Sequence, residues 1–210
     1  MKREYEEHSS ESVYRKLSFL RSTNTSSETS TASYINTSLK LVENYIKVKT
    51  KIRFVGGIYG SLLSGRDSTG GLQVQGYNGS SKLRFWNGVG ASVDIGSTLQ
   101  KNTDYEIEFI CNGKNISLTI NNSSYTSSNG KTPLTCSQNI GMFASIRNTG
   151  LDSATNMRIY YCKIYNSSGI ILRDFQPMLR IADQKPGMFD YITNSFYTQA
   201  NPSAPEFEYE

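Results

Sequence analysis

A stretch of strict alternation, NYIKVKTKIRFV at residues 44–55, constrains the fold of this chain more than any other feature. Side chains that repeat with a period of two share one face of a β-strand, so the apolar residues lie on one side and the cations on the other. The cations are Lys47, Lys49, Lys51 and Arg53. This stripe would suit an anionic partner such as an acidic polysaccharide, but a solvated outer face is the favoured interpretation.

The rest of the chain continues the β pattern. No segment of ten or more residues shows a helical period, and the 210 residues include 14 Tyr, 9 Phe and only 5 Pro among abundant Ser, Thr and Asn. Short strands recur about every 8–12 residues between polar turns. We therefore predict an all-β fold, a two-sheet antiparallel sandwich.

Two hairpins stand out. DYEIEFICNGKNISLTIN carries the turn signal Asn112-Gly113, and LQVQGY with KLRFWNG carries Asn78-Gly79, read as a two-residue type I′ turn. Alternation predicts that these side chains face the core: Leu72, Val74, Leu83, Phe85, Tyr105, Ile107, Phe109, Ile116, Leu118 and Ile120.

The opposite face of the 72–87 hairpin supplies the candidate ligand-binding residues. They are Gln73, Gln75, Tyr77, Arg84 and Trp86. Sugars stack on aromatic rings while amides and guanidinium groups bind their hydroxyls, so this set indicates a glycan site. An equally weighted alternative is that the N-terminal strands or a neighbouring subunit cover the two aromatic side chains.

The first residues differ from the rest. Residues 1–14 are charged and nearly free of core residues, which predicts an N-terminal arm or anchor ahead of a sandwich over residues 15–210. Tyr5 and Val13 are its apolar anchors, and Glu4, Glu6, Glu7 and Glu11 are its acidic groups. No secretory signal and no apolar run of about 18 residues occurs, so we expect a soluble protein made in the cytoplasm, without membrane or nucleic-acid partners.

Cysteine and histidine usage gives no catalytic or metal motif. Cys111, Cys136 and Cys162 lack metal-ligand spacing and His8 is the only histidine, so we predict buried free thiols, no catalytic residues and no metal. Calcium is an alternative at the loops SGRDSTGG and NTGLDSATN, where Asp67 and Asp152 are lone carboxylates.

The C-terminal part carries a resemblance to a known family. YYCKIYNSSGIILRDFQPMLR followed by PGMFDYITNSFYT resembles the closing strands of concanavalin A-like, laminin-G-like jelly-roll modules of tailed-bacteriophage proteins and gut bacteria. The resemblance extends over roughly residues 15–200 and implies that the first and last strands pair and close the sandwich. Arg173 and Asp174 would then form an edge or interstrand ion pair.

The resemblance also implies a function. We expect a non-enzymatic virion protein, a head or tail appendage that joins other virion proteins through its arm and binds host-surface polysaccharide, with self-association left open. A bacterial carbohydrate-binding module is the alternative. A β-glucan hydrolase is a further one, but Glu106 and Glu108 do not complete the Glu-x-Asp-x-x-Glu pattern of the glucanases of this fold.

Overall fold

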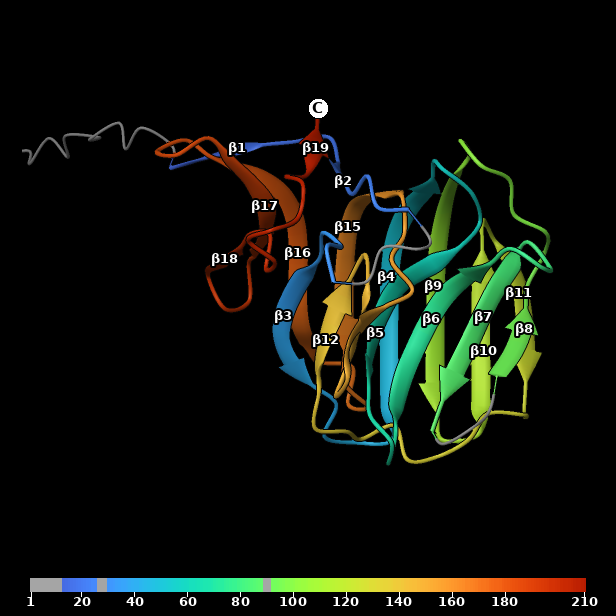
Figure 1. The fold of residues 1–210 in the computed structure, drawn as a ribbon. Coiled ribbons are helices and arrows are strands. Elements are labelled where there is room, and N and C mark those ends of the chain that lie inside the picture. The colour runs from blue at the N-terminus through green and yellow to red at the C-terminus, as the bar shows by residue number, and fades with distance from the viewer. Residues whose placement is uncertain (1–12, 26–29, 89–91) are drawn as a thin grey trace, which may run out of the picture.

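The computed structural model describes residues 13–25, 30–88 and 92–210, which form two β-sheets packed face to face (Figure 1). These ranges contain no helix, and hence none long and apolar enough to cross a membrane. The predicted all-β sandwich is confirmed.

The larger sheet has eight strands in a continuous row and three short strands beside them. In spatial order the row is β11 (Ser123–Ser127), β10 (Asn115–Ile120), β9 (Asp104–Asn112), β4 (Tyr45–Phe54), β15 (Met157–Tyr165), β16 (Ile171–Arg180), β17 (Lys185–Asp190) and β18 (Ser195–Tyr197). The short strands are β1 (Tyr14–Lys16), β2 (Leu20–Arg21) and β19 (Glu208–Tyr209).

The smaller sheet carries the candidate ligand-binding residues. Its row is β14 (Gly150–Asp152), β13 (Ser145–Arg147), β5 (Gly60–Arg66), β6 (Gly71–Tyr77), β7 (Lys82–Asn87) and β8 (Ser92–Ile95). Two further strands, β3 (Ile35–Lys40) and β12 (Asn139–Met142), pair with each other, and β12 also pairs with β5. All pairs are antiparallel except β13 with β5, which run parallel.

The core lies between the two sheets, and strand alternation fills it as predicted. Every second side chain of β4 is buried, and all ten core residues predicted for the two hairpins are buried as well. Phe85 of the smaller sheet and Phe109 of the larger sheet meet edge to face with ring centroids 5.4 Å apart. This aromatic contact joins the two layers of the sandwich.

The two ends of the chain close the larger sheet side by side, as the resemblance implied. Arg21 of β2 lies opposite Arg158 of β15 on one side and Glu208 of β19 on the other. β1 pairs with β16, and the Tyr14 ring packs 4.9 Å from the Phe189 ring. Val13 is exposed, whereas residues 1–12, with Tyr5 and the four glutamates of the predicted arm, lie outside the described residues.

One turn differs from the prediction. Tyr77 pairs with Lys82, so the loop between β6 and β7 has four residues rather than a two-residue turn at Asn78-Gly79. The backbone N–H groups of Ser80 and Ser81 both donate to the Tyr77 carbonyl, and Ser81 has a φ of 52°. Because the longer loop leaves the strand register intact, the predicted alternation still holds.

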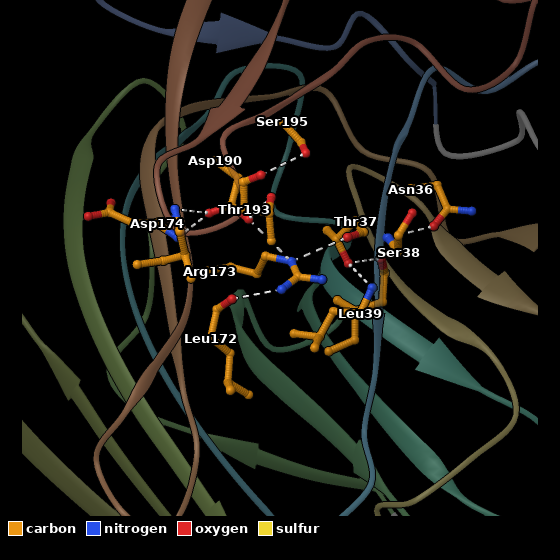
Figure 2. A network of polar contacts seen from close by, with 12 residues as sticks. Asn36, Thr37, Ser38, Leu39, Leu172, Arg173, Asp174, Asp190, Thr193 and Ser195 are labelled. Atoms are coloured by element: carbon orange, nitrogen blue, oxygen red, sulfur yellow. Dashed lines mark hydrogen bonds and ion pairs between the residues drawn. The ribbon is translucent and has the colours of Figure 1, made fainter.

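Arg173 and Asp174 do form interstrand ion pairs, but the expected edge position and their pairing with each other are wrong. The two side chains pair with different partners, Arg173 with Asp190 at 3.4 Å and Asp174 with Lys163 at 2.9 Å, and β16 is an interior strand. Figure 2 shows the Arg173 guanidinium reaching from β16 toward Thr37 of β3. This buried network therefore ties the two sheets together, because β3 belongs to the smaller sheet and β16 to the larger one.

Candidate ligand-binding face

The smaller sheet brings the predicted site residues to one outer face. Gln73 lies opposite Trp86 and Gln75 opposite Arg84 in neighbouring strands, and Tyr77 follows on β6. Directly opposed residues in an antiparallel pair point to the same side, so these five side chains share the face turned away from the core. The hydrophobic alternation of the hairpin sets this arrangement.

Gln73 lies beneath that face rather than on it. Its side chain is fully buried, and its amide nitrogen donates to the Ser61 hydroxyl at 2.7 Å and to the Gln75 amide oxygen at 2.8 Å. The second hydrogen bond fixes the orientation of the Gln75 amide. Gln73 is thus placed to position Gln75, whose own amide nitrogen makes no hydrogen bond within the described ranges.

Each candidate aromatic ring is already covered on one face by an arginine. The guanidinium carbon of Arg84 lies 3.2 Å from the Tyr77 ring centroid, and that of Arg66 lies 5.3 Å from the Trp86 ring centroid. Arg84 is held by two hydrogen bonds to Asp94, of 2.5 and 3.0 Å, which raise the pKa of Arg84. The rings therefore offer a ligand their edges and their remaining surface rather than two open faces.

A neutral pocket of about 240 Å³ adjoins Tyr77 on this face. Its lining consists of Tyr59, Gly60, Gln75, Gly76, Tyr77, Asn78, Ser153 and Ala154. Gly60 has a φ of +80°, and a Cβ built there would lie 2.1 Å from the Ala154 carbonyl oxygen, so only glycine allows the two segments to approach this closely. The pocket offers amides and hydroxyls without any charged side chain.

Sequence patterning did not indicate that Arg66 and Arg147 lie together on the same face. Arg66 and Arg147 are direct neighbours in the parallel pair of β5 and β13, and both contact Asp152, at 3.4 Å and 2.6 Å. Burial lowers the pKa of Arg66, and the nearby Asp152 carboxylate partly offsets this shift. Arg66 and Asp152 lie in the two loops singled out as calcium candidates, but their proximity depends on a strand pairing across about 80 residues that local pattern does not reveal.

The two calcium candidates are both engaged with donors. Asp67 accepts hydrogen bonds from the backbone and hydroxyl groups of Thr69 and Ser137 and from the Gly70 backbone. These hydrogen bonds hold the pKa of Asp67 far below its usual range, and the bond from the Thr69 hydroxyl contributes most. Asp152 is occupied by its two arginines. A cation would have to displace these donors, and the described residues contain no cluster of three or more His, Cys, Asp or Glu side chains.

The thiols follow the prediction with one exception. Cys111 and Cys162 are buried and free. Cys136 is also free but only half-buried, and its sulfur donates to the Gly65 carbonyl at 3.2 Å.

The lysine stripe of β4 faces carboxylates of β9. Glu108 lies within 3.1 Å of Lys47 and 2.9 Å of Lys49, and Asp104 pairs with Lys51 and Arg53. Cross-strand pairing of opposite charges stabilises a sheet surface, which supports the solvated-face interpretation.

The two glutamates of the hydrolase alternative belong to this same outer face of the larger sheet. Glu106 accepts a hydrogen bond of 2.6 Å from the Tyr161 hydroxyl. Burial tends to raise the pKa of Glu108, but Lys49 and Lys47 outweigh it and hold the pKa below its usual range. A general acid for glycoside hydrolysis needs the opposite shift.

Comparison with known proteins bears on the fold. No protein-family model and no curated protein sequence matches the chain. Among solved structures, the chain is similar to a "putative carbohydrate binding protein" from Bacteroides ovatus, with a TM-score of 0.59, 10% sequence identity and 93% of this chain covered. The chain spans only 60% of the length of that protein. At this identity the likeness establishes a shared sandwich architecture and leaves the function to be argued from the site.

Proposed function

We propose that this protein is a non-enzymatic glycan-binding module that binds its ligand on the outer face of the smaller sheet. One observation carries the proposal: the neutral pocket beside Tyr77, in which the buried Gln73 orients the amide of Gln75. A volume of about 240 Å³ lies just below the ~300–1,000 Å³ of pockets for drug-sized ligands, which suits a single sugar ring. The similar sandwich from Bacteroides ovatus bears the name "putative carbohydrate binding protein", which supports the same class.

The sugar ring would enter the pocket with its hydroxyls toward the Gln75 amide and its carbon skeleton against the edge of the Tyr77 ring. Trp86 and Arg84 would continue the contact surface along β7 toward neighbouring sugar units. Preorganised groups of this kind add affinity because little side-chain freedom is lost on binding.

A glycan array probed with purified protein tests the site. Gln75→Ala and Trp86→Ala should each weaken binding by roughly 5- to 100-fold, the usual range for a contact worth about 1–3 kcal/mol. Tyr165→Ala is the matched control, because this tyrosine carries a lysine, Lys47, over its ring on the larger sheet. Unchanged binding by the two site variants, with circular dichroism intact, contradicts the proposal.

Our further proposal is that the module is displayed on the head or tail of a phage particle and attaches through its first residues. The support is the resemblance of its closing strands to phage jelly-roll proteins and the charged arm. Because Tyr14 packs on Phe189 in the sandwich, a truncation should begin at Val13 so that β1 is kept. The truncated chain should fold and bind glycan but be missing from purified particles, as judged by mass spectrometry; its incorporation at the full-length level contradicts attachment through the arm.

The alternatives make different predictions. A bacterial module outside any virus would be absent from particles yet still bind glycans. A β-glucan hydrolase would release reducing sugar from laminarin, and the release would be lost in Glu106→Gln. We expect no release above that of the variant, since Glu106 and Glu108 are bound by Tyr161 and by two lysines.

A further inference from the structure

Arg66 and Arg147 form an unbalanced pair of like charges on the face proposed to bind glycan. They lie directly opposite each other in β5 and β13, and their neighbours across the next strands are Gly71 and Gly150. Like charges placed directly opposite each other destabilise a sheet. No carboxylate occupies this row, so the charges of the two arginines are not balanced within it.

The lysine stripe of the larger sheet shows the contrast. Lys49 and Lys163 are also cross-strand neighbours, but Lys49 faces Glu108 on its other side and Lys163 faces Asp174. That row is neutral and its charges are paired within it. Arg66 and Arg147 instead pair with Asp152, which belongs to the adjacent row and lies opposite Ser145 there.

Asp152 satisfies the two arginines only in part. A single oxygen, Oδ2, receives Arg147 Nη1 at 2.6 Å and Arg66 Nη2 at 3.4 Å, while the buried Oδ1 and the buried Arg66 Nε have no partner. Neither guanidinium makes another hydrogen bond to a described residue. The side chain of Arg147 is 40% exposed, so its unused N–H groups can be reached from solvent.

The arginine pair lies on the same sheet face as both parts of the proposed site. Arg66 lies over the Trp86 ring, reaching across β6 at Gly71, where no side chain intervenes. Asp152 directly precedes Ser153, which lines the neutral pocket. One ligand on this face would therefore meet a neutral pocket at one end and two partly unpaired guanidinium groups at the other.

We infer that the glycan recognised by this face is anionic, with an acidic oxygen group bound by Arg147 and Arg66 while a neutral sugar ring elsewhere in the same glycan occupies the pocket. Guanidinium groups bind carboxylate and phosphate oxygens in the same forked geometry, so either group on the glycan satisfies the chemistry. Asp152 bridges the two arginines and competes with the ligand for them. This inference rests on the proposed glycan-binding function and names its ligand class.

Binding to three polymers tests the inference: polygalacturonate supplies carboxylates, glycerol-phosphate teichoic acid supplies phosphates, and dextran is neutral. We expect the wild-type protein to prefer one of the acidic polymers to dextran, and Arg147→Ala to weaken that binding about 10-fold or more, as loss of charge-assisted hydrogen bonds does. Arg180→Ala is the matched control, because Arg180 is a partly exposed arginine paired with one aspartate, Asp183, away from this sheet.

Asp152→Asn separates ligand binding from a structural role. Removing the competing carboxylate should strengthen binding to the acidic polymer several-fold at low salt, whereas a purely structural aspartate would give no gain. The acidic polymer that responds to both substitutions identifies whether carboxylate or phosphate is the group bound.

The inference and the proposed function can fail separately. Equal binding of dextran and both acidic polymers, unaffected by Arg147→Ala, overturns the anionic ligand and leaves glycan binding intact. An equal loss in Arg147→Ala and Arg180→Ala also overturns it, because general attraction between charges would then explain the result. Binding to none of the three polymers, together with a blank glycan array, contradicts both.

Discussion

Replacing Asp190 with alanine tests how much the polar network around Arg173 stabilises the protein. The Asp190 side chain is fully buried, and its carboxylate accepts hydrogen bonds from the backbone of Asp174 at 2.8 Å and Ile192 at 3.1 Å and from the Thr193 hydroxyl at 2.7 Å. It also pairs with Arg173, whose side chain is only 15% exposed. Asp190→Ala therefore removes four interactions and leaves a mostly buried cation without its carboxylate (Figure 2).

The expected cost follows from what remains around Arg173. Removing one partner of a buried ion pair destabilises a protein by about 3–5 kcal/mol. Arg173 keeps a hydrogen bond of 2.8 Å to the Leu172 carbonyl and a longer one to the Thr37 carbonyl, which places the loss near the lower end, ~3 kcal/mol. At about 2–4 °C per kcal/mol for a protein of this size, the melting temperature should fall by roughly 6–12 °C.

Urea unfolding followed by tryptophan fluorescence and circular dichroism measures the loss as a lower midpoint at an unchanged slope. Asp183→Ala is the control, since Asp183 pairs with Arg180 on an exposed turn and should leave the midpoint where it is. A loss below about 1 kcal/mol for Asp190→Ala would show that the network adds little to the stability of the protein. An equal loss of unfolding free energy in Asp190→Ala and Asp183→Ala would also contradict a special role for the network.

Two further predictions follow from local geometry. Gly60→Ala should cost about 1–3 kcal/mol in urea unfolding, because its Cβ would collide with a backbone carbonyl, whereas Gly150→Ala, also at positive φ but with nothing within 4 Å, should cost less. Burial raises the pKa of all three thiols, but only Cys136 is partly exposed, so iodoacetamide at about pH 8 should modify native Cys136 well before Cys111 or Cys162, as read by mass spectrometry. Equal costs for the two glycines, or equal rates for the three thiols, would contradict these accounts.

The sequence predicted the fold wherever one strand face is buried and the other polar. The alternation from Ile46 to Phe54 fixed β4, and the register of β6 with β7 placed Gln75, Arg84 and Trp86 on one face as expected. The pairing of the first and last strands came from the resemblance of the closing segment. In each case the information is local, or is carried by a recognisable motif.

Other features depend on contacts that local patterning does not encode. The polar edge strand β11 is half exposed and has no alternation of its own, and β5 is buried on both faces, so neither has a strand period to detect. The burial of Gln73 results from Ser61 and Gln75 closing over it. The pairing of Arg66 with Arg147 arises from the parallel contact of two strands far apart in the chain.

The closure of the larger sheet by both ends of the chain has a consequence for folding kinetics. β2 cannot complete its pairing until β15 and β19 exist, and Phe207, next to β19, is itself buried against Phe143. Contacts over such long sequence separations form slowly, because the chain loses the entropy of loop closure before the contacts stabilise it. Nascent chains stalled before residue 207 should therefore remain protease-sensitive on the ribosome, and resistance at residue 180 would contradict this order of events.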